Sequence, residues 1–272
     1  MRVGVLGATG RMGRATCRAV PGAADLELAA AVAGQGSVGR ELCELVPEAP
    51  AGLCVQSSAQ DLVDAKVDVV VDFSLAEPAI AAARVLLPAG VHLVSGTTGL
   101  PAAAMEELRG LAEAPGSGNA VWAPNFALGA VLAQRFAAIA ARYYQAVEVI
   151  ELHHAGKADA PSGTAIRTAK AIAAARERAR AGATGQPAPA PPGRELVSGA
   201  RGGEVEGVHV HSVRLPGLVA HQEVIFGGQG EVLTVRHDSM DLSSFMPAVL
   251  LSVRAVPNRP GLTVGLEPLL DL

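Results

Sequence analysis

The chain has 272 residues, half of them hydrophobic and 3 % aromatic, with a formal net charge of −4. This length suffices for two modest domains with a sizeable core. No apolar run approaches the roughly 18 residues of a membrane span, and the apolar stretch at 3–6 is too short for a signal peptide. Few aromatic residues and no basic block argue against nucleic acid as a partner. The three cysteines form no C-x-x-C pair, which indicates reduced thiols and a cytoplasmic location.

The first half alternates short apolar strands with helices. Such alternation is typical of right-handed βαβ units in a parallel sheet, here a Rossmann-type α/β domain. Strands are predicted at 2–6, 26–32, 67–73, 91–95 and 120–123, and helices at 11–20, 77–87 and 101–114, the last with Pro101 in its first turn.

The second half changes character and predicts an α+β domain with an open sheet, mixed or antiparallel. Residues 1–126 are expected to form the first domain, with 246–272 returning to it, and residues 127–245 the second. The segment 182–192 is rich in Ala, Pro and Gly and predicts a mobile surface loop. Helices are predicted at 128–143, 162–180 and 242–253, and strands at 146–152, 207–215, 221–226 and 231–237.

Three glycines, Gly7, Gly10 and Gly13, follow the first strand and open the first helix. Glycine lets the backbone approach a pyrophosphate, and the helix N-terminus offers free N–H groups. The spacing alone is weak, because a tight turn without a ligand would use the same residues. Its place between strand and helix favours dinucleotide binding.

The usual acidic residue that binds the 2′-hydroxyl of the cofactor's ribose is absent from this sequence. An acidic residue about 20 positions after the glycine turn usually binds the ribose hydroxyls. Residues 30–35 instead read AAVAGQ, without an acid. Nothing there repels a 2′-phosphate, and Arg11, Arg14 and Arg40 are candidates to bind one. We therefore expect NADPH to serve at least as well as NADH.

Two later loops, 96–99 and 123–126, follow strands of the same predicted sheet. The carboxyl ends of parallel strands line the ligand crevice of such a sheet. Small hydroxyl and amide side chains there suit a nicotinamide carboxamide and its ribose. Ordinary turn chemistry is the alternative, since Gly, Thr, Pro and Asn all favour turns.

The segment 153–164, HHAGKADAPSGT, is unusually polar for this chain. Both His153 and His154 can serve one site only if the preceding strand ends near Leu152, because neighbours on a strand face opposite ways. A histidine titrates near neutral pH and can donate a proton, and Lys157 suits a carboxylate. A lone histidine at a strand end is more often structural, but the joint arrangement favours a site.

The end of this segment resembles a helix start. Ser162 is a candidate N-cap, and the N–H groups that follow would bind a second carboxylate, with the Thr164 hydroxyl adding a bond. Asp159 is expected to orient the turn and restrain Lys157. The alternative is a helix cap without a ligand.

The remaining histidines suggest no metal site. His209 and His211 share one strand face, as metal ligands do, but no further His or Cys lies nearby in sequence. A surface or core role is therefore favoured, and the same holds for His92, His221 and His237. No metal is expected.

Five motifs together resemble the dihydrodipicolinate reductase family (4-hydroxy-tetrahydrodipicolinate reductases of bacterial lysine and diaminopimelate biosynthesis), closest to its actinobacterial members. They are GATGRMG at 7–13, VDFS at 71–74, SGTTG at 95–99, APNFA at 123–127 and ELHHAGKADAPSGTA at 151–165. The match continues to the C-terminal GLTVGLEPLLDL. The HHxxKxDAPSGT pattern is highly specific, whereas the glycine turn is not.

The resemblance implies a Rossmann domain and a smaller α+β domain whose open sheet builds a homotetramer. It also implies hydride transfer from NADPH or NADH to the dihydropyridine-type ring of a small dicarboxylate substrate, after or with loss of water, giving tetrahydrodipicolinate. It assigns the general acid to His153 and a second catalytic, carboxylate-binding role to Lys157. Substrate binding is expected of His154, Ser162, Gly163, Thr164 and Thr98. Cofactor binding is expected of Gly7, Ala8, Thr9, Gly10, Arg11, Met12, Gly13, Gly96, Thr97, Thr98, Ala123, Pro124, Asn125 and Phe126.

Two positions depart from the family pattern. An acidic residue often stands where this chain has Ala33, and a histidine where it has Gly156. Gly156 keeps open a paralogous reductase that acts on another cyclic imino acid. A non-catalytic dinucleotide sensor would have no reason to retain His153 and Lys157 together.

Overall fold

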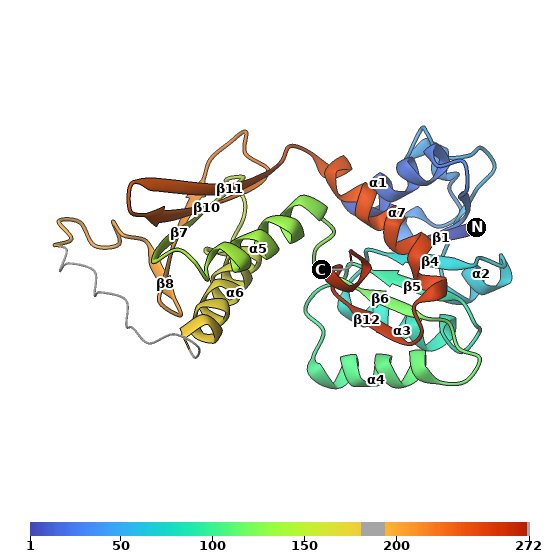
Figure 1. The fold of residues 1–272 in the computed structure, drawn as a ribbon. Helices are drawn as coiled ribbons and strands as arrows, with labels where there is room; N and C mark the ends of the chain where they lie inside the picture. The colour runs from blue at the N-terminus through green and yellow to red at the C-terminus, as the bar shows by residue number, and fades with distance from the viewer. Residues whose placement is uncertain (181–193, 271–272) are drawn as a thin grey trace. The chain divides into compact units, whose positions relative to one another are not determined.

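The computed structural model describes residues 1–180 and 194–270, so the loop predicted at 182–192 lies outside the described residues. The chain divides into two compact units (Figure 1). Unit 1 comprises Met1–Leu128 and Leu242–Leu272, and unit 2 comprises Gly129–Asp241. Among the described helices, none has the length and apolar character needed to cross a membrane.

Unit 1 is built on a seven-stranded sheet in which every paired strand runs parallel. Its order is β12-β6-β5-β4-β1-β2-β3, so the chain reverses direction across the sheet between β1 and β4. Ligands of open parallel sheets bind beyond the carboxyl ends at such a point. The Rossmann-type prediction is confirmed. The strands are β1 (Arg2–Leu6), β2 (Glu27–Val32), β3 (Val55–Gln56), β4 (Val69–Asp72), β5 (His92–Ser95), β6 (Ala120–Trp122) and β12 (Leu262–Val264).

Helices cover both faces of this sheet (Figure 1). An apolar cluster that includes Leu62, Leu86 and Leu108 joins three of them to one face. The helices are α1 (Arg11–Ala19), α2 (Ala59–Asp64), α3 (Ala76–Leu86), α4 (Ala102–Glu113) and α7 (Met246–Ala255).

The sequence prediction missed β3, α2 and β12, which are too short to show a clear hydrophobic period. Pro101 is the N-cap of α4 rather than part of its first turn. The helix predicted at 242–253 is a 3₁₀ turn, Leu242–Phe245, followed by α7.

Unit 2 is a five-stranded sheet of order β11-β10-β7-β9-β8. Strands β7 and β9 pair in parallel and the other pairs are antiparallel, so the predicted open mixed sheet is confirmed. Of its strands, only β8 was missed by the prediction. They are β7 (Ala146–His153), β8 (Gly203–Val205), β9 (Val208–Arg214), β10 (Ala220–Gly228) and β11 (Glu231–Ser239).

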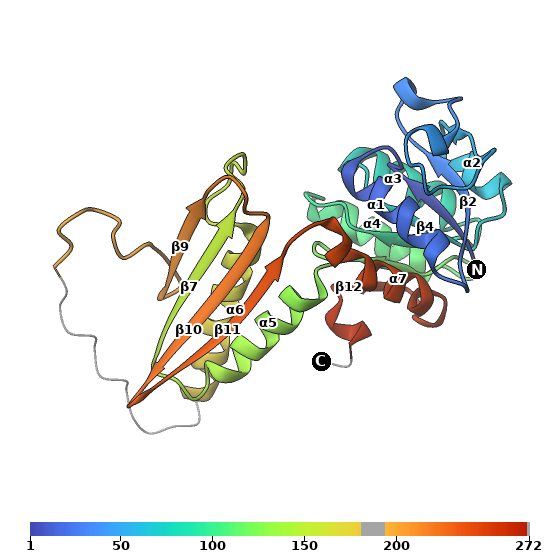
Figure 2. The same cartoon turned by 90° about the horizontal axis from the view of Figure 1, so that it is seen from above.

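Two helices, α5 (Leu128–Ala140) and α6 (Gly163–Arg180), lie along one face of this sheet (Figure 2). Val149, Ile172 and Phe226 are fully buried between the helices and the strands. Helix α5 ends three residues before the predicted limit at 143. Strand β7 runs one residue further than predicted, through His153.

Candidate active site

The glycine turn of unit 1 has the geometry that its residues require. Gly7 adopts a φ of +77°, and Gly10 is the extended N-cap of α1. A Cβ at Gly13 would lie 2.0 Å from the Gly7 carbonyl oxygen, so a side chain there is excluded. The close packing of α1 against the end of β1 therefore depends on glycine.

The amides of this turn divide into two groups. Those of Gly7 and Ala8 donate to the Val32 carbonyl at 2.9 and 3.0 Å, which fixes the turn to the end of β2. The amides of Arg11 and Met12 lie in the first turn of α1 and have no acceptor within the helix. They are the donors that the turn offers to a phosphate.

The end of β2 carries no acid, as the sequence showed. The nearly buried Ala33 follows this strand, and its amide donates to Gln56 at 3.2 Å. Two of the three candidate arginines are engaged: Arg14 donates to the Thr9 carbonyl at 2.8 Å, and Arg40 pairs with Glu44 at 3.0 Å. Arg11 is exposed and makes no hydrogen bond or ion pair with the described residues, so it is the one of the three whose guanidinium is not engaged by them.

A buried carboxylate that sequence reasoning missed organises the loops after β4 and β5. Asp72, the last residue of β4, is fully buried. Its Oδ2 accepts hydrogen bonds from the hydroxyls of Ser95 at 2.6 Å and Thr97 at 2.8 Å. Its Oδ1 accepts from the amide and hydroxyl of Ser74. The available signal was an acid at the end of an otherwise apolar run.

Aromatic packing holds the predicted cofactor loops at the same edge of the sheet. The rings of Phe73 and Phe126 meet edge to face with centroids 5.6 Å apart. A Cβ at Gly96 would lie 2.2 Å from the Phe73 ring, so this position also requires glycine. The Thr97 carbonyl accepts from the Trp122 indole at 2.8 Å, so Thr97 is engaged on both sides, while Thr98 remains exposed.

The remaining predicted loop residues, 123–126, follow β6 at this edge. Ala123 and Phe126 are buried, whereas Pro124 is exposed. The Asn125 side chain accepts a hydrogen bond from the Ala127 amide at 2.9 Å. Unit 1 thus brings its three predicted cofactor segments to one end of the sheet.

Unit 2 contains a second buried carboxylate that the sequence prediction missed. Glu151 in β7 is fully buried, and both of its oxygens accept from the Arg214 guanidinium, at 2.7 and 3.0 Å. Its Oε2 also contacts Nδ1 of His153, two residues further along the same strand face. The signal was the alternation of Val147, Val149, Glu151 and His153, which places the glutamate on the helix-covered face.

The charge of Glu151 is stabilised by these partners. Burial alone would raise its pKa, but hydrogen bonds from His153, Arg214 and Ser212 outweigh burial and lower the pKa to about 2. Glu151 is therefore a carboxylate at neutral pH. Since it occupies Nδ1 of His153, Nε2 is left for a reacting group, and the His153 side chain is 15 % exposed.

The two candidate histidines differ in their setting. His153 ends β7, while His154 follows the strand and is exposed. The Lys157 amide donates to the His154 carbonyl at 3.1 Å, which closes a turn. Lys157 Nζ pairs with Asp159 at 2.7 Å, the restraint that the sequence suggested. Arg214 also donates to the Asp159 carbonyl at 2.6 Å, so one guanidinium holds both Glu151 and this turn.

The predicted helix cap is confirmed. Ser162 Oγ accepts from the Ala165 amide at 3.2 Å, in the first turn of α6. The Ser162 amide donates to Glu151 at 3.3 Å, which ties the helix start to the same carboxylate. The amides of Gly163 and Thr164 have no acceptor within the helix and form the second candidate anion site.

Three of the other histidines, His92, His211 and His221, have partners within the fold. His211 pairs with Glu148 at 2.8 Å, and His221 with Asp238 at 2.7 Å. His92 accepts from the Asn119 amide at 2.9 Å. In residues 1–180 and 194–270, no group of three His, Cys, Asp or Glu side chains is arranged to hold a metal ion.

A Rossmann-type unit with a glycine turn, together with a mixed-sheet unit carrying a carboxylate-held histidine and a lysine, defines a dinucleotide-dependent oxidoreductase. Residues 1–126 match the family model described as dihydrodipicolinate reductase, N-terminus, and residues 129–270 match its C-terminus counterpart. The chain belongs to the dihydrodipicolinate reductase family, which confirms the resemblance seen in the sequence.

Individual relatives agree. The 4-hydroxy-tetrahydrodipicolinate reductase of Nocardia farcinica is 52 % identical over 273 residues, covering 100 % of this chain and 99 % of that protein. The protein of the same name from Mycolicibacterium smegmatis is 46 % identical and covers 100 % of both. The dipicolinate-bound dihydrodipicolinate reductase from Paenisporosarcina sp. TG-14 superposes with a TM-score of 0.83 at 37 % identity, over 98 % of both chains.

Proposed function

We propose that this chain reduces 4-hydroxy-tetrahydrodipicolinate to tetrahydrodipicolinate with NADPH or NADH, in diaminopimelate and lysine biosynthesis. The observation that carries the proposal is His153, held by Glu151, which pairs in turn with Arg214. His153 lies in one turn-and-helix segment with Lys157 and the N-terminus of α6. Unit 1 would bind the dinucleotide, and unit 2 would bind the substrate and form the oligomer.

The substrate's two carboxylates need two anion sites, and unit 2 offers both. Lys157 with His154 would bind one carboxylate, and the amides of Gly163 and Thr164 the other. Charge-assisted hydrogen bonds of this kind contribute roughly 1.5–3 kcal/mol each. The Paenisporosarcina enzyme supports a dicarboxylate substrate, since the dipicolinate bound to it is itself a dicarboxylate.

The reaction also needs a proton, and His153 is the proposed donor. A bound NADPH or NADH supplies the hydride. Loss of water from the 4-hydroxy substrate gives a conjugated imine. Hydride addition to that imine leaves an enamine-like carbon that must be protonated. Glu151 fixes the ring through Nδ1, so that Nε2 is the atom that delivers the proton.

The residues of unit 1 fit a dinucleotide. The amides of Arg11 and Met12 would bind its pyrophosphate, and 96–98 with 123–126 its nicotinamide half. Ala33 removes the repulsion that an acid would exert on a 2′-phosphate, and Arg11 is free to bind it. We therefore expect kcat/KM with NADPH to equal or exceed that with NADH. Steady-state kinetics with both cofactors test this, and a large preference for NADH would contradict it.

A homotetramer in the cytoplasm is the proposed state. The face of the unit 2 sheet away from α5 and α6 carries ion pairs between strands, His211 with Glu148 and Arg236 with Glu223, and leaves Val232 69 % exposed. Such a self-complementary face suits contacts between copies. Light scattering on the purified protein tests the assembly. Three free cysteines are consistent with a reducing compartment.

The decisive experiment is a coupled assay. The upstream synthase makes the intermediate in situ, and loss of NAD(P)H absorbance is followed when this protein is added. Rapid turnover supports the proposal, and Lys157→Ala is expected to damage both KM and kcat. Poor turnover of this intermediate, with reduction of another cyclic imino acid, would favour the paralogous reductase that Gly156 keeps open.

A further inference from the structure

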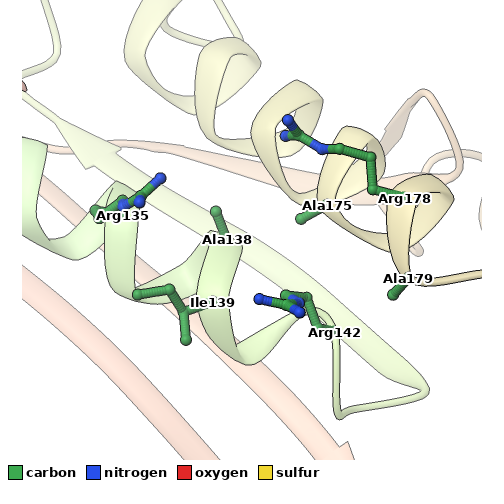
Figure 3. A pocket seen from close by; sticks show the side chains of 7 residues that line it. All are labelled: Arg135, Ala138, Ile139, Arg142, Ala175, Arg178 and Ala179. Carbon is green, nitrogen blue, oxygen red and sulfur yellow. The ribbon is translucent and has the colours of Figure 1, made fainter. Parts of the chain in front are cut away.

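A groove of about 360 Å³ lies between α5 and α6 on the helix layer of unit 2 (Figure 3). Three arginines line it: Arg135 on α5, Arg142 just beyond the end of α5, and Arg178 on α6. Arg135 lies within α5, whereas Arg142 lies two residues beyond its end, and both side chains line the groove. Small and apolar side chains, Ala138, Ile139 and Ala175, lie between the arginines.

The charges of these arginines are not balanced by the protein. No Asp or Glu lines the groove. Among the described residues, Arg135 has no hydrogen-bond or ion-pair partner. The Arg142 guanidinium lies 5.9 Å from the centroid of the adjacent Tyr143 ring, and Arg178 donates one bond to the Ala174 carbonyl of its own helix.

Several arginines elsewhere on the surface pair with acidic side chains. In unit 1, Arg2 pairs with Glu27 at 2.7 Å, Arg84 with Glu107 at 2.6 Å and Arg254 with Asp25 at 2.8 Å. A cluster of three uncompensated guanidinium groups therefore stands out in a chain whose net charge is −4. Like charges around one groove repel each other unless an anion lies among them.

We propose that this groove binds a small molecule carrying two or more phosphate groups. Guanidinium forks match phosphate oxygens in pairs. The stretch from Arg135 to Arg142, most of it in α5, is about 10 Å long at the helical rise per residue, so a chain of phosphates spans the two arginines better than a single sulfate or acetate would. Ile139, which is 46 % exposed, offers apolar contact to the remainder of the ligand. The groove volume falls within the range of small-molecule sites.

The groove is independent of the proposed active site. Its lining residues belong to α5, to the turn that follows it and to the C-terminal half of α6, and include none of the residues assigned to substrate or cofactor. The homotetramer proposed above uses the other face of the sheet.

Isothermal titration calorimetry with tripolyphosphate tests the proposal. The full chain is titrated at about 0.15 M salt, where long-range attraction is screened. Saturating NADH and dipicolinate are present to occupy the proposed active site. We expect one saturable site per chain. Arg135→Gln/Arg142→Gln should weaken binding by at least about tenfold, since hydrogen bonds to charged groups are lost.

A matched double variant controls for net charge. Arg84→Gln/Arg109→Gln removes two exposed positive charges from unit 1 and should change the affinity less than about twofold. Arg178→Lys keeps the charge but loses the fork, so an intermediate loss is expected. All variants should keep the melting temperature and NAD(P)H-dependent turnover of the parent.

Three results would overturn the proposal: no saturable binding, equal weakening in both double variants, or much tighter binding of an RNA oligomer or acidic peptide lost in the groove variants. The last would assign the groove to a macromolecule. Failure of the coupled assay alone would contradict the proposed function without affecting this binding measurement.

Discussion

Asp72 in unit 1 and Glu151 in unit 2 are both fully buried carboxylates near the ends of strands, yet they are stabilised by different partners. Asp72 accepts from the hydroxyls and one amide of loop residues, Ser74, Ser95 and Thr97. Glu151 accepts from an arginine and contacts a histidine. The hydroxyl and amide donors around Asp72 fix the geometry of the loops and take no part in proton transfer. The arginine and histidine beside Glu151 instead link that carboxylate to a group that can transfer a proton.

The difference matches the tasks proposed for the two units. A buried carboxylate is costly unless all its acceptor sites are filled. In unit 1 that requirement draws two loops together at the edge where a dinucleotide would bind. In unit 2 it fixes the ring of His153, the start of α6 and the turn that carries Lys157. The comparison therefore predicts that damage to Asp72 affects cofactor binding and damage to Glu151 affects the proton step.

The largest effect is expected at the histidine that Glu151 holds. His153→Gln keeps a side chain of similar size but removes the proton donor, so kcat should fall by about 10²-fold or more. The Kd for NADPH, measured by fluorescence, should remain within about twofold. Unchanged turnover would refute the assignment of His153. A loss of NADPH affinity as large as the loss of kcat would show that cofactor binding and the proton step are not divided between the two units.

Glu151→Gln is expected to have the next largest effect, on stability and its pH dependence. The folded-state pKa of Glu151, about 2, lies below the ordinary value of 4.5. This carboxylate therefore contributes stability that is fully present above about pH 4.5 and lost as the pH falls towards 2. The difference corresponds to roughly 3 kcal/mol.

Urea unfolding of the parent and the variant at pH 7 and pH 3 measures this contribution. The stability gap between them should be on the order of 3 kcal/mol at pH 7. It should narrow at pH 3, where the Glu151 carboxyl of the unfolded parent, with its ordinary pKa of 4.5, has bound a proton. A gap of the same size at both pH values would show that Glu151 acts only through packing.

Asp72→Asn sharpens the comparison from the other side. An amide offers one acceptor oxygen where Asp72 offers two, so at least one of Ser74, Ser95 and Thr97 loses a partner. We expect the KM for NADPH to rise by about tenfold, because the loops lose their common anchor, and the protein to lose about 1–3 kcal/mol of stability.

Ser95→Ala is the matched control for Asp72→Asn, since it removes one of the same hydrogen bonds without changing the carboxylate. It should raise the KM for NADPH in the same direction but less. If Asp72→Asn instead lowers kcat and leaves the KM for NADPH unchanged, the division of tasks between the two carboxylates fails.

The same two carboxylates show what sequence reasoning reached and what it could not. The glycine turn and the Ser162 cap were predictable because their interactions lie within a few residues of each other. Asp72 meets Ser95 and Thr97 23 and 25 positions away, and Glu151 meets Arg214 63 positions away. Neither pairing has a local pattern, because strand neighbours are set by the order of the sheet.

The predicted boundaries of some strands were wrong for a related reason, since they too depend on pairing between distant residues. Strand β7 runs one residue past its predicted end because His153 still pairs across to Ala220 of β10 and Arg214 of β9. Strand β12 is only three residues long, and its pairing with β6 connects residues far apart in the chain. Propensity and periodicity read short windows, and these features depend on partners outside the window.

Gly156, where the family resemblance led us to expect a histidine, lies outside the bonds that Glu151 makes. A Cβ there would meet only the His154 ring, at 3.5 Å, which is ordinary contact. Gly156→His should therefore fold normally and add a cation beside Lys157. We expect the substrate KM to fall by a few-fold, with kcat unchanged. The gain should be larger at pH 6 than at pH 8, because the added imidazole is charged only at the lower pH.

Gly156→Gln, which adds bulk without a titrating charge, should show no such pH dependence. If both variants behave alike, position 156 has no influence on carboxylate binding. The positive charge that binds the substrate carboxylates is then already supplied by Lys157 and the start of α6.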